Sequence, residues 1–363
     1  MLKKIASACV VLGSASAANA QSSVQIYGIM DLAVEHLNNV GPGKDGLTRM
    51  PSLTGSAPSR LGFRGTEDLG GGLHAGFNLE MWLNPDSGQV DNGGRGFGRI
   101  ATVSLGGPWG DVSVGRQRTM LFWSILDADV IGPNMHSMAN FDPFFATDMV
   151  DNSISYLGRF SGFTVGANYS FGRDKLNAGP SPAGTNCAGE SASDKKACRA
   201  WSVVAKYDAA RWGVAVAHDV IHGGPGAFDG LTSSNLSDTR TMFNGYFNVA
   251  SLKVGGGYMR RKNEGHAQPR SDLWFLGASY PMGDFSLDAQ YNLYKTKDLS
   301  DKGQLVVLRG TYNLSKRSAV YASLGFEKNS GSAAYTVSGA QPGANPMPGV
   351  NQTGFGVGIR HVF

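Results

Sequence analysis

The last eleven residues of the chain alternate between two kinds of side chain, and this alternation constrains the fold more than any other feature. One face carries Phe355, Val357, Ile359, His361 and Phe363, and the other carries Gly354, Gly356, Gly358, Arg360 and Val362. Successive side chains of a strand point to opposite faces, so a period of two predicts a β-strand. A strand that ends on an aromatic ring is typical of a membrane barrel. The outer face of such a strand contacts lipid, and the terminal ring lies at the membrane–water interface.

The same alternation recurs along the chain, for example in residues 73–81, 163–171 and 285–293. These segments are nine residues long, which matches the ~9–11 residues that a tilted strand needs to cross a bilayer. Strands of soluble sandwiches average only ~5–6 residues. Segment length therefore favours a membrane barrel over a soluble β-protein.

The N-terminus has the three parts of an export signal. Lys3 and Lys4 precede a short apolar stretch, residues 5–13, and Ala18-Asn19-Ala20 has the small-x-small form of a cleavage site. We expect residues 1–20 to be a cleaved signal peptide and residues 21–363 to form a single barrel domain. Removing Lys3 and Lys4 leaves 30 basic against 28 acidic residues, a net charge of +2, which gives no indication of nucleic-acid binding.

The connections between alternating segments are short and long in turn. Turns at residues 68–72, 107–110, 281–284 and 315–317 separate longer polar stretches, as in outer-membrane barrels. Both chain ends are expected on the periplasmic side. About sixteen strands are predicted, to within two, with starts near Val24, Ser59, Leu73, Arg99, Asp111, Ser153, Phe163, Trp201, Trp212, Arg240, Ser251, Asp272, Phe285, Gln304, Ser318 and Thr353.

Two cysteines remain after the signal, Cys187 and Cys198, in a segment rich in Gly, Ser, Ala and Lys. Export permits a disulfide, and their spacing would close a small loop, so pairing is favoured over two free thiols. No Cys/His spacing typical of a metal site is present, and no cofactor is expected.

Three stretches resemble Gram-negative general-diffusion porins, in particular the trimeric type of betaproteobacteria. They are Val24–Asp31, Ser59–Gly72 and Gly358–Phe363, which resemble the opening strand, the second strand with its turn and the closing strand of that family. The resemblance implies an all-β, sixteen-stranded antiparallel transmembrane barrel with a long third loop folded into the lumen. It also implies a homotrimer in the outer membrane and a terminal Phe363 that the outer-membrane assembly machinery reads.

A pore selects by size and by charge at its narrowest point. In the second strand Leu61 and Phe63 occupy the lipid face, so Arg60 and Arg64 face the lumen. The resemblance assigns wall arginines of the constriction to this region, and Arg60 and Arg99 stand at the matching places. The resemblance implies a third wall arginine in the strand after the long loop. Arg159 alternates onto the same inward face as that position but lies closer to the turn that follows the strand.

Residues 118–152 form the longest connection and combine apolar with acidic side chains. Because many exposed apolar side chains are unfavourable, we expect this loop to pack against the inner wall and to face the arginines with carboxylates. The alternative is an external lid. Parity does not decide between Asp127, Asp129 and Asp142 as the carboxylates that line the eyelet.

Arg116 shares a face with Val112 and Val114, which is the predicted lipid face. A cation there costs ~2–4 kcal/mol at mid-bilayer. Burial against another subunit with an acidic partner would remove that cost, so Arg116 is predicted at a trimer interface, with residues 84–96 as a possible latch. The alternative places Arg116 near the headgroups.

The sequence thus predicts an outer-membrane porin for passive diffusion of small hydrophilic solutes and ions, with a slight preference for anions. Its expected surroundings are outer-membrane lipid and lipopolysaccharide. A substrate-specific channel or an adhesin barrel is the alternative. An enzyme is not expected, because no GxSxG run occurs and the seven histidines are scattered.

Overall fold

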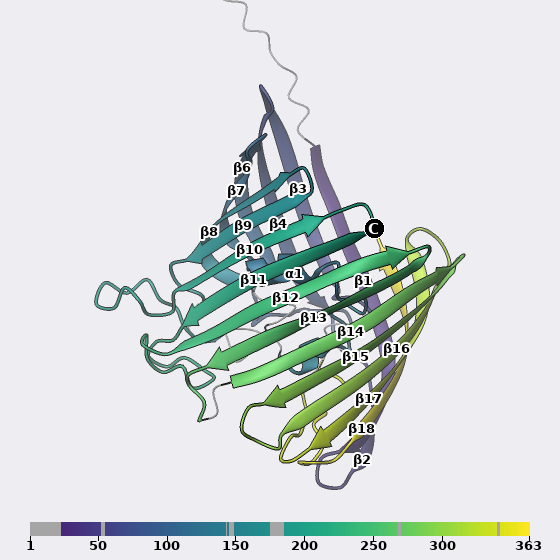
Figure 1. Ribbon diagram of the computed structural model, residues 1–363. Helices are drawn as coiled ribbons and strands as arrows, with labels where there is room; N and C mark the ends of the chain where they lie inside the picture. Colours follow the sequence, from purple (N-terminus) through teal and green to yellow (C-terminus); the bar gives the residue numbers. More distant parts are fainter. Residues whose placement is uncertain are drawn as a thin grey trace, which may run out of the picture.

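The computed structural model describes residues 23–51, 55–142, 144, 149–174, 185–267, 270–339 and 342–363. These residues form one antiparallel sheet that closes on itself as a sixteen-stranded barrel (Figure 1). Every predicted strand start lies within four residues of an observed one, and the fold prediction is confirmed. The barrel strands are β1 (Ser23–Val40), β3 (Arg60–Gly70), β4 (Leu73–Asn84), β6 (Ile100–Gly107), β7 (Gly110–Arg118), β8 (Met149–Phe160), β9 (Phe163–Ser170), β10 (Ala200–Asp208), β11 (Trp212–His222), β12 (Ser237–Val249), β13 (Leu252–Asn263), β14 (Arg270–Met282), β15 (Phe285–Thr296), β16 (Lys302–Asn313), β17 (Ser318–Ser330) and β18 (Gln352–Val362).

Four shorter elements lie in the connections. They are β2 (Asp45–Arg49), β5 (Gln89–Val90), the helix α1 (Met120–Ile125) and a 3-10 turn, η1 (Met138–Asn140). Among the described residues, no helix is long and apolar enough to cross a membrane. The predicted signal peptide, residues 1–20, lies outside the described residues.

The barrel closes through β1, which is long enough to pair with two neighbours. Residues 23–29 of β1 pair with β3, and residues 29–37 pair with β18. Phe363 follows β18 and exchanges two backbone hydrogen bonds with Gly28, at 2.9 and 3.1 Å. A Cβ on Gly28 would lie 2.5 Å from the Phe363 ring, so this close approach requires glycine.

Alternation along each strand separates an apolar outer surface from the lumen. In β14 the outward Trp274 and Leu276 are exposed, whereas the inward Leu273 and Phe275, which alternate with them, are buried. The outward Phe355, Val357 and Ile359 of β18 are exposed in the same way. An outer surface covered by large apolar side chains is typical of a lipid-facing barrel wall.

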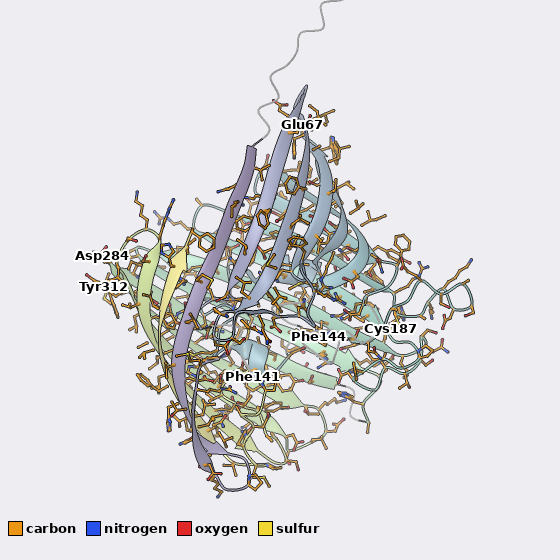
Figure 2. All side chains as sticks on the ribbon, turned by 180° about the vertical axis from the view of Figure 1, so that it is seen from behind. Glu67, Phe141, Phe144, Cys187, Asp284 and Tyr312 are labelled. Atoms are coloured by element: carbon orange, nitrogen blue, oxygen red, sulfur yellow. A yellow bond between two sulfur atoms is a disulfide. The ribbon has the colours of Figure 1, made fainter. Side chains whose placement is uncertain are left out.

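The two ends of the barrel differ in the length of their connections. Both termini of the barrel and the tight turns lie at one end, which Figure 2 marks with Glu67 and Asp284. The long connections lie at the other end, where the β2 hairpin projects in Figure 1. We call these the short-turn end and the long-loop end.

The third long loop, residues 119–148, enters the barrel, and the structure describes 119–142 and 144 of it. Figure 1 shows α1 inside the ring of strands. Leu121, Ile125 and Ala128 of this loop are buried in one cluster with inward wall side chains that include Met242 and Leu273. Burial of each large apolar side chain contributes about 1.5–3 kcal/mol, so the loop is held firmly against the inner wall. The predicted position of the third loop is confirmed.

Candidate channel constriction

Arg60 and Arg99 converge on one carboxylate in the wall opposite the third loop. The Arg60 Nε lies 3.6 Å from Glu80 Oε2, and the Arg99 Nε donates a hydrogen bond to Glu80 Oε1. The Arg60 side chain is 26% exposed, whereas the Arg99 side chain is 5% exposed. Arg60 therefore faces the lumen directly, and Arg99 lies behind it and balances Glu80.

Arg64 lies on the same face as Arg60, four residues nearer the short-turn end. Its Nε donates to Gln25 Oε1 at 2.9 Å, and its guanidinium lies 4.8 Å from the centre of the Tyr27 ring. Four residues along a strand correspond to ~13 Å. Arg64 is thus an exposed lumen cation below the level of Arg60.

Two further arginines lie where the wall meets the third loop. Arg118, at the end of β7, is buried with its guanidinium 3.8 Å from the centre of the Phe122 ring. Arg159 of β8 approaches the Trp123 ring at 5.9 Å. Both aromatic rings belong to α1, so cation–π contacts hold this end of the loop against the arginine side of the wall.

Asp127 is the exposed carboxylate of the described loop. Its side chain is 41% exposed, accepts a hydrogen bond from the Lys206 Nζ of β10 and lies 3.9 Å from the Lys253 Nζ of β13. Asp208 also binds Lys206, at 3.1 Å. Two wall lysines thus neutralise this exposed loop carboxylate.

Asp129 belongs to the anchor of the loop. Its Oδ1 accepts the backbone N–H of Ile131 at 3.2 Å, and burial raises the pKa of the Asp129 carboxyl. Arg309 of β16 donates to the Ile131 carbonyl at 2.9 Å and pairs with Asp288 at 2.9 Å. This turn of the loop is therefore attached to the far wall through backbone groups.

Asp142 does not line the open lumen. Neither its side chain nor that of Arg240 is exposed, and the two form a double contact at 2.8 and 3.1 Å. Although burial opposes ionisation, Arg240 and the nearby Arg261 lower the pKa of Asp142 to about 2. The eyelet role that the sequence allowed for Asp142 does not fit this burial, and Asp142 instead fixes the loop to β12.

A third anchor lies at His136. Its Nδ1 is 3.0 Å from Ser323 Oγ of β17, and its Nε2 is 3.8 Å from Glu35 Oε2 of β1. Arg49 and Ser338, from two other connections, bind the opposite oxygen of Glu35 at 2.6 and 3.0 Å. Burial lowers the pKa of His136 to about 4, so the imidazole is neutral at physiological pH.

Arg116 finds an acidic partner within its own chain. Its Nη1 lies 2.6 Å from Asp151 Oδ1 of β8, and Arg95 of the preceding loop binds the same carboxylate at 3.1 Å. Gly115, with φ of +123°, lies at a register shift that interrupts the regular pairing with β8 before it resumes at Gln117. The charge of Arg116 is therefore balanced without a second subunit, and its place at an interface stays a prediction.

Comparison with known proteins agrees with this architecture. The family model described as Gram-negative porin matches residues 6–332. Outer membrane porin protein 32 of Delftia acidovorans is 33% identical over the full length of both chains. The chain belongs to the Gram-negative porin family.

Solved structures place this porin in the same fold group. The anion-selective porin from Comamonas acidovorans is 28% identical, with a TM-score of 0.76 over 94% of this chain and 100% of that one. The trimer form of OmpT from Vibrio cholerae is 16% identical with a TM-score of 0.63, covering 94% and 99%. The second likeness shows the fold alone. Family membership makes this chain a channel protein of the outer membrane.

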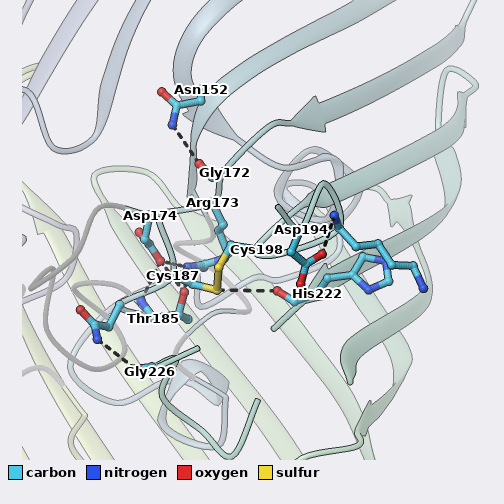
Figure 3. The surroundings of a disulfide bond; sticks show 12 residues. Asn152, Gly172, Arg173, Asp174, Thr185, Cys187, Asp194, Cys198, His222 and Gly226 are labelled. Atoms are coloured by element: carbon cyan, nitrogen blue, oxygen red, sulfur yellow. Dashed lines mark hydrogen bonds and ion pairs between the residues drawn. A yellow bond between two sulfur atoms is a disulfide. The ribbon is translucent and has the colours of Figure 1, made fainter. Parts of the chain in front are cut away.

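Cys187 and Cys198 of this porin form a disulfide, with sulfur atoms 1.98 Å apart (Figure 3). The Arg173 N–H donates to the Cys198 carbonyl at 2.8 Å, and the Asp174 N–H donates to the Cys187 carbonyl at 2.9 Å. The Cys198 N–H in turn bonds the Gly223 carbonyl at 2.8 Å. The bridge thus closes a small loop within the connection between β9 and β10, and the Cys198 backbone bond joins that connection to the loop after β11 at the long-loop end.

Sequence reasoning missed Lys206 and Arg240, two of the wall cations that hold the loop carboxylates. Lys206 shares the inward parity of Val204 in β10, and Arg240 shares that of Met242 in β12. Alternation alone would have placed Lys206 and Arg240 in the lumen. Nothing in the sequence indicated which carboxylate each would bind.

Proposed function

We propose that this porin conducts small hydrophilic solutes and ions through a constriction between Arg60 and the third loop, with a preference for anions. The supporting observation is that the charged side chains of the constriction pair unequally, with more cations than carboxylates. Asp127 is matched by Lys206 and Lys253, and Asp142 by Arg240 and Arg261. Arg60 and Arg99 share one wall carboxylate, Glu80, and Arg64 contacts Gln25 and the Tyr27 ring, so positive charge is in excess on the arginine side.

The physical consequence of that excess is a favourable potential for anions in a narrow lumen. Low-dielectric walls focus the field of uncompensated charges along the pore. The similar porin from Comamonas acidovorans is anion-selective, which supports the same assignment for this chain. Glu80 weakens the field of the arginines but does not cancel it.

We also propose that the mature protein begins at Gln21, forms one barrel domain and assembles as a homotrimer. Outer-membrane lipid and lipopolysaccharide would surround the trimer. Phe363 lies exposed at the barrel seam, where the outer-membrane assembly machinery can reach it. The outward surface around Arg116 is the proposed contact between subunits. Replacing Val103, which is 61% exposed beside this surface, by Lys should convert trimers to monomers on a non-denaturing gel; persistent trimers would exclude this face.

The test of conduction is a planar bilayer measurement on the folded mature protein. Stepwise current increases are expected, and a KCl gradient should give a reversal potential of the sign that an anion-preferring pore produces. A folded protein without conductance would exclude the channel, and a reversal potential of the opposite sign would exclude the anion preference.

A further inference from the structure

Glu327 of β17 is a buried carboxyl group without a counter-charge. It lies on the inward face of the strand, and none of its surface is exposed. The Gln304 N–H approaches the carboxyl, but within the described part of the chain neither carboxyl oxygen has a hydrogen-bond partner of normal geometry or an ion-pair partner. An ionised carboxylate in such surroundings is strongly unfavourable, because it has lost its hydration and gained no partner in return. This arrangement therefore requires the protonated, neutral form of Glu327.

Three parts of the molecule meet at this carboxyl group. A Cβ on Gly303 of β16 would lie 2.8 Å from Glu327 Oε1 and 2.7 Å from Tyr335 Cδ2, and it would also touch the Phe141 ring. Phe141 belongs to the third loop. Tyr335 belongs to residues 333–339 of the connection between β17 and β18, which are called the inner segment below. Because Gly303 has no side chain, both rings can approach Glu327.

The two rings form a cluster with Tyr294 of β15. Phe141 stacks on Tyr294 with ring centres 5.4 Å apart, and the Tyr335 ring lies edge-on to both, at 5.2 and 5.4 Å. Aromatic pairs of this geometry attract one another beyond the effect of burial alone. The cluster therefore places apolar carbon, and not water, next to the Glu327 carboxyl.

The third loop and the inner segment also bind each other directly. Asn140 Nδ2 donates to the Val337 carbonyl at 2.6 Å. The side chains of Val337 and His136 pack over Gly325 of β17, and both residues are fully buried. Gly325 is two residues from Glu327 on the same inward face. The third loop and the inner segment thus share one junction, and Glu327 lies beneath it.

No described cation is placed to stabilise an ionised Glu327. Lys302 and Lys328 alternate onto the outer face of the barrel, and Asp142 is paired with Arg240. The ionisable side chains on the elements packed against Glu327 are His136, Asp142, Tyr294, Asp301, Lys302, Lys328 and Tyr335. Those that face the junction are neutral or acidic at physiological pH. Ionisation of Glu327 would therefore leave a negative charge in the junction that only water can stabilise.

From this arrangement we propose that Glu327 is a positioning residue for the long-loop end of the channel. In its neutral form Glu327 keeps the third loop and the inner segment together, and its ionisation separates them and increases conductance. Hydration of the carboxylate requires water to enter between the Phe141 and Tyr335 rings. Because the third loop lies inside the barrel, separation of the junction widens the water-filled path beside that loop. This inference rests on the proposed channel function and adds proton control to it.

Single-channel recording of the folded mature protein tests this role, with the pH on both sides of a planar bilayer varied from about 7 to about 9.5. Exposed carboxyl groups titrate below this range, and tyrosine and lysine titrate above it. A second, higher conductance level should appear in the wild type as the pH rises. Because one proton controls the transition, the fraction of time at the higher level should rise about tenfold for each pH unit until it saturates.

Three variants separate the carboxyl from its surroundings. Glu327→Gln keeps the size of the side chain and removes its ionisation, so this channel should stay at the lower level throughout; Glu327→Leu should behave alike and serves if the amide disturbs folding. Asp298→Asn removes an exposed acid at the same end of the barrel and should respond to pH as the wild type does. Tyr335→Leu weakens the ring cluster without changing Glu327 and should reach the higher level at a lower pH.

The same pH response in the wild type and in Glu327→Gln, or no response in the wild type, would overturn the role of Glu327. A Tyr335→Leu channel with the wild-type pH profile would overturn the junction as its site of action. A folded protein without conductance at any pH would instead exclude the channel itself, so failure of this inference and failure of the proposed function give different results.

Discussion

Asp142 of the third loop and Arg240 of β12 form an ion pair in which neither side chain is exposed. The third loop has no regular backbone pairing with the barrel wall. The Asp142–Arg240 contact fixes it at a point that lies far along the loop from α1. An ion pair so deeply buried is destabilised strongly when one partner is lost, because the remaining charge has no solvent to replace it.

Asp142→Asn should therefore destabilise the protein by about 3 kcal/mol, the lower end of the range for such pairs, since Arg240 keeps Asp238 at 3.1 Å. The freed loop should also produce rapid fluctuations in the open-channel current. Denaturant unfolding and single-channel recording measure the two effects. Asp298→Asn, at an exposed loop acid, is the matched control. A quiet channel of unchanged stability in D142N would show that the pair does not hold the loop.

Charge reversal at Arg60 should shift the reversal potential toward cation preference. Arg60→Glu places a second carboxylate beside Glu80 on the exposed side of the lumen wall and changes the local charge by two units. Arg64→Glu, ~13 Å nearer the short-turn end, should give a smaller shift in the same direction. Lys316→Glu, in the short turn between β16 and β17, should give none. An Arg60 variant with the wild-type potential would remove Arg60 from the constriction.

Gly255 of β13 sets the distance between the third loop and the wall. A Cβ at this position would lie 2.1 Å from the backbone oxygen of Ala128, so Gly255→Ala must push the loop into the lumen. We expect lower single-channel conductance and a stability loss of about 1–3 kcal/mol. Gly256→Ala, whose Cβ points outward and meets its nearest atom at 3.0 Å, is the neighbouring control. Equal conductance of the two variants would contradict this contact.

Stability should depend on pH through His136. An unfolded histidine has a pKa of about 6.5, and burial lowers the pKa of His136 to about 4 in the folded protein. As pH falls below about 6.5 the unfolded chain gains a proton that the folded chain excludes, so stability declines until pH reaches about 4. The 2.5-unit gap corresponds to about 3 kcal/mol.

Urea unfolding in detergent at several pH values measures this slope. His136→Gln should be less stable at neutral pH and should flatten the slope between pH 6.5 and 4. A slope that the substitution leaves unchanged would assign the pH dependence to other groups.

Loss of the Cys187–Cys198 bridge should loosen the long-loop end and leave conduction unchanged. A bridge that closes a loop of this size contributes about 2–3 kcal/mol. In Cys187→Ser/Cys198→Ser, trypsin should cut faster at Lys195 and Lys196, which lie between the two cysteines. The rate at Lys316 and Arg317 in the short turn is the internal reference. Unaltered cleavage at Lys195 would mean that the backbone contacts to Gly223 hold the loop without the bridge.

Sequence reasoning located the strands well because alternation is a local property of each segment. The pattern at Phe285–Leu293 identifies its strand without knowledge of any partner. The same parity placed Arg60 and Arg64 in the lumen. It could not assign Asp142 to Arg240, because that pair depends on which part of the wall the third loop meets, and residues 98 positions apart carry no shared local pattern.

Arg116 shows a different limit of the same reasoning. Parity assumes that a strand has no irregularity, but Gly115 introduces a register shift beside Arg116. The acidic partner, Asp151, starts the next strand, where sequence analysis expected the tail of a loop. The irregular backbone brings Arg116 next to Asp151 of the same chain. The alternation pattern alone had led us to expect the acidic partner of Arg116 in another subunit.

The pairing of β1 with β18 joins segments more than 300 residues apart, and this has a consequence for folding. Contacts between distant segments form late, because the entropy of closing a long loop must first be lost. Until β18 is in place, β1 and β17 each present an unpaired edge, which is a template for wrong association. Barrel closure is therefore an event of the whole chain, and a defect in residues 352–362 should trap an open, aggregation-prone sheet.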